Sequence, residues 1–178
     1  IVGALSPPEL AEQKKTLHAG ADGSIWQDSQ TLADALEHIV TEVAVNCADQ
    51  ISLGRSKRAE LCIDRETGCI RLWNDGRIPI EKHPQRTDLY NAEVIYGLMN
   101  SSSNYSDAAK AKNNQFTGGR NGIGAKATNI LSKRFTVACA DAELGLQLVA
   151  TWHDGMTVAD GAKVKTLKSS QKHSSVCV

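Results

Sequence analysis

The sequence lacks an excess of charge of either sign. Lys and Arg together number 20, and Asp and Glu together also number 20, so the formal net charge at pH 7 is zero. A protein that binds nucleic acid through overall basicity, or a basic partner through an acidic tail, would show an imbalance. Any contact with DNA must therefore come from a local basic patch or from sequence outside this chain.

Long apolar runs are also missing. No stretch approaches the roughly 18 apolar residues that span a bilayer, and the N-terminus lacks the charged and apolar regions of a secretory signal. We therefore expect a soluble, intracellular protein with no membrane partner. The chain begins at Ile1 and not at a methionine, so we expect it to be a piece of a longer protein.

Paired cysteine spacing, which would indicate a metal site or a disulfide framework, is absent as well. The sequence contains an odd number of cysteines, and most of them have apolar neighbours. We expect all of them to be reduced and buried as small apolar side chains. They are Cys47, Cys62, Cys69, Cys139 and Cys177.

What the chain does have is an ordinary globular composition. It is 41% hydrophobic and 22% charged over 178 residues, which suits one packed domain. No internal repeat or linker divides it. We expect a single domain over residues 1–178, with its core at 32–152, an N-terminal extension at 1–31, and a loosely ordered, truncated polar tail at 153–178.

The most informative stretch is residues 117–126, which contains four glycines and ends in Lys126, before a helix predicted at 127–133. Glycines let a backbone approach a ligand closely, and the first amides of a helix attract anions. We interpret this stretch as a polyphosphate cradle. A Walker loop fits poorly because Ala127 follows the lysine where Ser or Thr is needed. A dinucleotide fingerprint fits little better because no strand leads into the turn, and an ordinary glycine-capped loop remains an alternative.

A helix is predicted at residues 29–50, where apolar residues recur at helical spacing. Glu42, Asn46 and Asp49 are spaced i, i+4 and i+7, so they share a second face beside the apolar stripe. Such a trio is either a solvated polar face or the wall of a cleft.

The segment that follows predicts a hairpin, with strands at residues 59–64 and 69–73. It ends in a polar turn, Asn74 to Gly76, which either presents an amide to a planar base or is a plain turn. After a short helix at 92–99, the hydroxyls and amides of residues 100–105 either contact sugar and phosphate oxygens or cap that helix. The polar residues 106–115 are typical of a mobile flap, and two further strands are predicted at 135–140 and 144–151.

Together these motifs resemble the ATPase domain of eukaryotic-type (type IIA) DNA topoisomerases, in the gyrase, MutL and histidine-kinase ATP-binding superfamily. The similar segments are residues 42–49, a helix motif; 73–77, an adenine-binding turn; 102–105, a serine stretch; and 117–126, a phosphate loop. The resemblance implies an α/β fold, a two-layer sandwich with helices on one face of a mixed β-sheet (the Bergerat-type ATP-binding fold). ATP would lie between helix and loops.

The resemblance also implies roles for individual residues. Glu42 would be the catalytic base that activates the water attacking the γ-phosphate, Asn46 would bind ATP and hold Mg²⁺ through its amide oxygen, and Asn74 would hydrogen-bond the adenine. ATP binding would close two protomers of a nuclear homodimer around a DNA segment, in an ATP-dependent type II topoisomerase. The other ATP contacts would come from Ser102, Ser103, Asn104, Gly119, Arg120, Asn121, Gly122, Ile123, Gly124, Ala125 and Lys126.

One departure from the family pattern keeps other classes open. A glycine of the adenine-binding turn is absent, because Arg77 is followed directly by Ile78. This favours, as an alternative, a degenerate copy that acts as a non-catalytic interaction module. A chaperone, a mismatch-repair protein or a kinase of the same superfamily is a third class, against which the phosphate loop and the serine stretch argue. The transducer and the breakage-reunion domain are not apparent, so this chain alone is not expected to change DNA topology.

Overall fold

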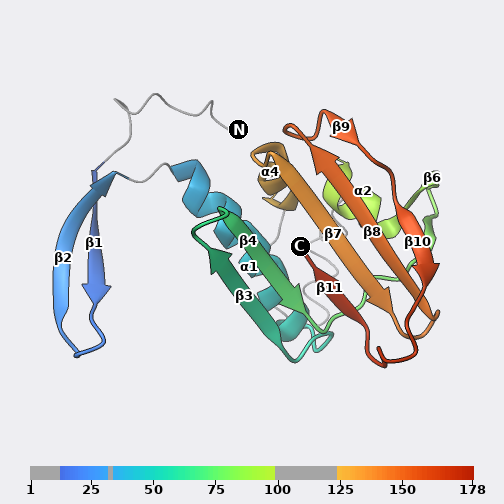
Figure 1. Ribbon diagram of the computed structural model, residues 1–178, viewed down its shortest axis with the longest axis horizontal. Helices are drawn as coiled ribbons and strands as arrows, with labels where there is room; N and C mark the ends of the chain where they lie inside the picture. The colour runs from blue at the N-terminus through green and yellow to red at the C-terminus, as the bar shows by residue number, and fades with distance from the viewer. Residues whose placement is uncertain (1–12, 32–33, 99–123) are drawn as a thin grey trace, which may run out of the picture.

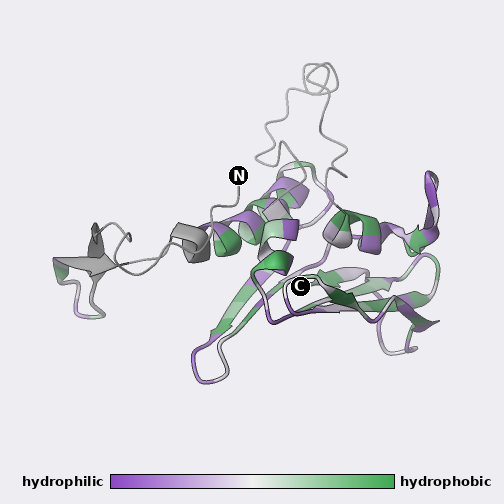
Figure 2. Cartoon of the chain, turned by 90° about the horizontal axis from the view of Figure 1, so that it is seen from above, coloured by the Kyte–Doolittle hydropathy of each residue, from purple (hydrophilic) through white to green (hydrophobic). Residues whose placement is uncertain are grey.

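The molecule has two layers, with helices on one face of a seven-stranded sheet (Figures 1 and 2). The computed structural model describes residues 13–31, 34–98 and 124–178. The strand order is β10-β8-β7-β11-β4-β3, with β9 paired to β8, and the pairs between these described strands are antiparallel. The expected two-layer α/β sandwich is confirmed. The helices are α1 (Asp34–Ser52), α2 (Asn91–Gly97) and α4 (Gly124–Ile130).

Two hairpins supply the long strands of the sheet, as the sequence predicts. Alternation along β7 sends Phe135, Val137 and Cys139 into the core, where they are buried beneath the helices. The hairpin strands are β3 (Ala59–Asp64) with β4 (Cys69–Asn74), and β7 (Arg134–Asp141) with β8 (Leu146–His153).

The expectation of a loosely ordered tail after residue 152 is wrong. This segment forms β9 (Val158–Ala159), β10 (Lys163–Thr166) and β11 (Ser175–Cys177). Strand β11 lies between β7 and β4, where Val176 pairs with Cys139 on one side and with Asn74 on the other. A three-residue strand in a polar segment has little local signal, because its order comes from partners distant in the sequence.

The start of the long helix also differs from the prediction. Helix α1 begins at Asp34, whereas residues 29–31 belong to β2 (Ile25–Thr31), which pairs with β1 (Gln13–Ala19). The turn between these strands is closed by Asp22, whose carboxylate accepts hydrogen bonds from the amide and the hydroxyl of Ser24. Ile39 and Cys47 of the predicted apolar stripe are buried, whereas the predicted N-terminal boundary of the helix is wrong.

A last two-stranded hairpin, β5 (Lys82–His83) with β6 (Arg86–Tyr90), packs beside α2. All five cysteines are free, but only Cys47 and Cys139 are buried, while Cys62 and Cys69 are exposed on the β3–β4 hairpin. The expectation that every cysteine is buried is therefore wrong. Within the described ranges, no helix is both long enough and apolar enough to cross a membrane.

Candidate functional site

The polar face of α1 forms one wall of the candidate site. Its predicted base, Glu42, and its predicted metal ligand, Asn46, are partly exposed, whereas Asp49 is buried. The three residues therefore do not form a fully solvated stripe. Helix α4 is held against this wall by the hydroxyl of Thr128, which donates a hydrogen bond to the carbonyl of Ile39 at 3.0 Å.

Gly124, the first residue of α4, lies directly against Glu42. A β-carbon at this position would overlap the Glu42 carboxylate and would lie 3.0 Å from the Glu42 Cβ. Because the Glu42 Cβ is fixed to the backbone of α1, it cannot swing aside as the carboxylate can. Only glycine allows this approach, and the fold brings the end of the predicted phosphate loop onto the predicted base.

Lys126 lies one residue after Ala125 on the buried side of α4. Its side chain is 3% exposed, and burial lowers the pKa of its ammonium group to about 8. The charged form is still the main one at pH 7, but water has been removed from around it.

Asn74 lies across from α1 at the end of β4, where it is buried. Its amide Nδ2 donates to the Sγ of Cys47 at 3.2 Å, and its Oδ1 accepts a hydrogen bond from the amide of Gly76 at 2.9 Å. Burial raises the pKa of the Cys47 thiol, so this thiol stays protonated at neutral pH. The carbonyl oxygen of Asn74 keeps a second lone pair, which suits the exocyclic amine of a base.

The turn after Asn74 is anchored by Asp75. One carboxylate oxygen accepts hydrogen bonds from the Ser56 hydroxyl at 2.6 Å and from the amides of Lys57 and Arg58 at 2.7 and 3.0 Å. These donors lower the pKa of Asp75 to about 2, the Ser56 hydroxyl contributing most. Gly76 is needed here, because a β-carbon would lie 2.6 Å from the Asn74 Oδ1.

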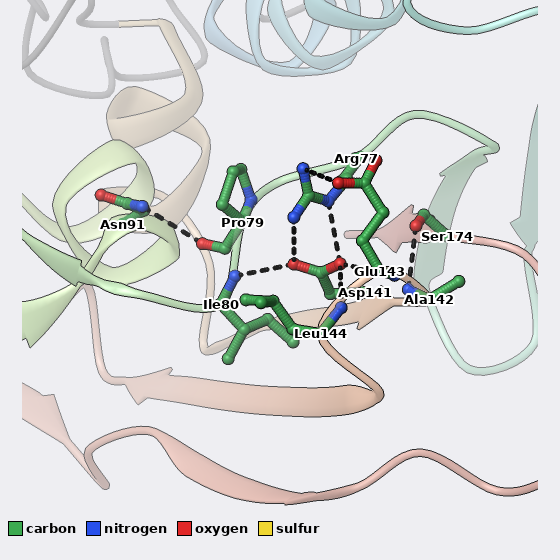
Figure 3. A network of polar contacts seen from close by, with 9 residues as sticks. All are labelled: Arg77, Pro79, Ile80, Asn91, Asp141, Ala142, Glu143, Leu144 and Ser174. Atoms are coloured by element: carbon green, nitrogen blue, oxygen red, sulfur yellow. Dashed lines mark hydrogen bonds and ion pairs between the residues drawn. The ribbon is translucent and has the colours of Figure 1, made fainter.

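The shortened part of the turn is fixed by a polar network at the end of β7 (Figure 3). Arg77 donates from Nε and Nη2 to the two carboxylate oxygens of Asp141, at 2.8 and 3.1 Å, and pairs through Nη1 with Glu143 at 2.8 Å. The amide of Ile80 also donates to Asp141, at 3.2 Å. Arg77, just before the missing glycine, and Ile80, three residues further along the chain, are therefore tied to one buried carboxylate.

Sequence reasoning did not find this network or the Cys47–Asn74 contact. The only local signal was an arginine inside the turn motif and an aspartate at the end of a predicted strand. The partners Arg77 and Asp141 are 64 residues apart, so spacing gives no information on their contact.

The described residues thus bring together Glu42, Asn46 and Asn74 from one side and Gly124 to Lys126 from the other. No group of three or more His, Cys, Asp or Glu within residues 13–31, 34–98 and 124–178 could hold a metal ion. Several predicted contacts lie outside the described residues, and they stay predictions: Ser102, Ser103, Asn104, Gly119, Arg120, Asn121, Gly122 and Ile123.

Comparison with known proteins gives consistent matches. The chain is 34% identical to DNA topoisomerase 2 of Candida glabrata and 33% identical to that of Saccharomyces cerevisiae, each over 170 residues, or 94% of this chain and 12% of the relative. The crystal structure of the ATPase region of Saccharomyces cerevisiae topoisomerase II superposes with a TM-score of 0.84 at 31% identity, covering 93% of this chain and 43% of that one. No family model matches the sequence.

A second solved structure agrees. The ATPase and transducer domains of DNA topoisomerase II from Balamuthia mandrillaris match with a TM-score of 0.78 at 34% identity, over 92% of this chain and 43% of that chain. Since the chain spans only 12% of the length of the two fungal relatives, the similarity concerns their ATPase part.

Proposed function

The chain belongs to the ATPase domains of type IIA DNA topoisomerases, and on that premise we propose that it binds and hydrolyses ATP to drive the DNA strand passage of a longer parent enzyme. The observation that carries this proposal is the contact between Gly124 and Glu42, because it brings the end of the phosphate loop to the carboxylate. The match to the yeast ATPase region supports it independently.

In this proposal ATP lies between α1 and α4. The adenine amine binds the Oδ1 of Asn74, which the amide of Gly76 already holds in place. The triphosphate meets the first residues of α4 and the ammonium group of Lys126, because an ammonium group donates strong hydrogen bonds to phosphate oxygens. The serine stretch and the rest of the glycine loop complete the predicted contacts.

Glu42 is the proposed general base. Its carboxylate is partly exposed, so an attacking water can reach it, and it lies at the end of the loop that holds the γ-phosphate. In phosphoryl transfer the protein mainly positions groups and stabilises charge, and a base that orients the water adds typically 10²- to 10⁴-fold in rate.

The residues present also fit Mg²⁺. This ion usually takes one or two protein oxygen ligands together with phosphate oxygens and water, and Asn46 lies one turn of α1 from Glu42, where its amide oxygen can serve as that ligand. When bound, Mg²⁺ neutralises charge that develops on the phosphates. Asn46 would orient it, and Glu42 would keep its own role toward water.

Further consequences concern the whole enzyme. We propose that ATP closes two protomers into a dimer clamp, that the clamp captures a DNA segment, and that hydrolysis releases it in the nucleus. The names of the relatives, "DNA topoisomerase 2", support DNA as the partner, and the dimer, the clamp and the nuclear location are part of the proposal.

The test separates binding from chemistry. In Glu42→Gln, which keeps shape but not basicity, we expect near-normal calorimetric affinity for a non-hydrolysable ATP analogue with Mg²⁺, and hydrolysis in the parent enzyme lowered about 100-fold or more. Glu66→Gln, in the exposed β3–β4 turn, is the matched control and should leave both unchanged. Hydrolysis by Glu42→Gln at the parental rate would remove Glu42 from the mechanism.

A further inference from the structure

No described element covers the face of the sheet that lies opposite the helices. It is the face turned toward the viewer in Figure 1, and Figure 2 shows the helices gathered on the other side. Residues that point to the helices along these strands, such as Leu72, Val137 and Leu148, are buried. Their neighbours in each strand point to the uncovered face, because side chains alternate along a strand.

One row of paired residues crosses this face from β10 to β4, and Trp73 at its end pairs in turn with Glu60 of the edge strand β3. Lys163 pairs with Val149, Val149 with Ala138, Ala138 with Cys177, and Cys177 with Trp73. Directly paired residues share a face, so all five side chains point away from the helices. Four strand spacings of about 4.8 Å separate Lys163 from Trp73, a distance of about 19 Å.

Basic side chains lie at both ends of this row, and at one end they are accompanied by Glu60. At one end, Arg58, Glu60, Arg71, Trp73 and Cys177 line a shallow depression of about 300 Å³. Arg58 pairs with Glu60 at 3.2 Å, and both side chains remain largely exposed. Arg71 makes no ion pair with a described residue.

At the other end, two exposed lysines of β10 reach the same face. Lys165 follows Lys163 by two positions and pairs with Gln147, so it points to the same side. The helix layer has the opposite balance. Helix α1 contains four acidic residues and no lysine or arginine, so the zero net charge of the chain hides a polarised charge distribution.

We propose that Arg58, Arg71, Lys163 and Lys165, here called the basic face, bind the phosphodiester backbone of duplex DNA. This inference rests on the proposed function, which supplies DNA as the partner, but the basic face is separate from the ATP site. Backbone contact needs positive charge over a broad surface and no base-reading pocket, and the small side chains between the two ends leave such a surface open. Measured along the axis of a duplex, about 19 Å corresponds to five or six base pairs at about 3.4 Å each, so both ends can reach phosphates of one duplex.

The test measures binding of the 178-residue chain to a fluorescent 30-base-pair duplex by anisotropy over a series of salt concentrations. Each lost phosphate contact lowers the slope of log K against log salt by about 0.9. Arg71→Gln combined with Lys163→Gln should therefore lower the slope by about 1.8 and, at about 0.1 M salt, the association constant by about 60-fold.

The control pair is Arg86→Gln combined with Lys133→Gln, which changes the net charge equally. Arg86 lies in the β5–β6 hairpin and Lys133 in the turn before β7, outside the basic face. The proposal expects near-parental DNA binding for this pair. Equal weakening in both pairs, or an unchanged slope in the first pair, would overturn it.

Two further measurements keep the result specific. Circular dichroism and ATP-analogue affinity should be unchanged in both pairs, so loss of DNA binding with normal analogue affinity supports the basic face. A chain that binds duplex through the basic face but no ATP analogue would refute the proposed function and leave this inference standing. Tighter binding of a single strand than of the duplex would overturn the assignment to duplex DNA.

Discussion

Replacing Arg77 by methionine tests how the adenine-binding turn is held. Asp141 is fully buried, and besides the two bonds from Arg77 its carboxylate accepts hydrogen bonds from the amides of Ile80, Glu143 and Leu144 at 3.2, 3.1 and 3.2 Å. Methionine keeps an unbranched apolar stem that reaches about as far as the arginine Nε, and it removes the guanidinium. The carboxylate then stays buried with amide donors and no cation.

The magnitude follows from what remains. Removing one partner of a fully buried ion pair costs about 3–5 kcal/mol. Here Arg77 is itself 29% exposed and the amide bonds persist, so we expect a loss of about 2–3 kcal/mol in the free energy of unfolding. For a chain of this size, each kcal/mol shifts Tm by about 2–4 °C, which gives a decrease of about 4–12 °C by calorimetry at pH 7.

Glu143→Gln is the matched control, because Glu143 pairs with the same arginine but its side chain is 70% exposed. Surface pairs contribute about 0–1 kcal/mol, so this variant should stay close to the parental Tm. A Tm for Arg77→Met within 1 °C of the parental value, or an equal loss in Glu143→Gln, would refute the view that Asp141 anchors the turn.

The same pair gives a pH dependence. Burial opposes ionisation of Asp141, but Arg77 and the amides outweigh it, so the pKa of this carboxyl lies below its usual value. A depressed folded-state pKa contributes stability above the unfolded value of about 3.9, and this contribution is lost as pH falls. In denaturant unfolding, the free energy of unfolding of Arg77→Met should therefore be lower than that of the parental chain at pH 7, and the two values should lie closer together below about pH 4.

Two further predictions concern α4. Because burial lowers the pKa of Lys126 to about 8, the affinity of the parental chain for an ATP analogue should fall as pH rises through 8. In titrations between pH 7 and 9.5, Lys126→Met should bind the analogue more weakly and lose this pH dependence. An equal pH dependence in the variant would contradict the assignment. Gly124→Ala places a methyl group against Glu42, so ATP hydrolysis by the parent enzyme should fall at least about tenfold, and the free energy of unfolding should fall by about 1–3 kcal/mol. Hydrolysis at the parental rate would show that α1 and α4 can move apart without consequence.

The sequence predicted those parts of the site that depend only on local sequence patterns. The i, i+4 spacing of Glu42 and Asn46 depends only on helical geometry, and α1 does carry both residues. The hairpin ending at Asn74 follows from alternation and a glycine turn, and β3 and β4 confirm it. The start of α4 at Gly124 follows from the glycine loop to within three residues of the predicted helix start.

The parts that the sequence did not predict depend on distant partners. Strand β11 has three residues in a polar segment, yet it joins the two hairpins into one sheet by pairing with β7 and β4. The charge polarity between the sheet and the helices is equally invisible in the composition, because it requires the strand register. Local periodicity predicts which segments form helices and strands, but the residues that share a sheet face are known only once the strand register is known.

The shortened adenine turn shows why the absent glycine is weak evidence for a degenerate copy. A glycine matters in such a turn when the backbone must approach a ligand, and Gly76 still provides that freedom beside Asn74. Asp141 holds Arg77, just before the deletion, through its side chain, and Ile80, three residues further along, through its amide. A turn with these ties has a defined shape without the second glycine. Loss of nucleotide binding would therefore need a cause other than a collapsed turn, and Arg77→Met, which releases the turn but leaves the proposed ATP contacts in place, should weaken analogue binding if that shape matters.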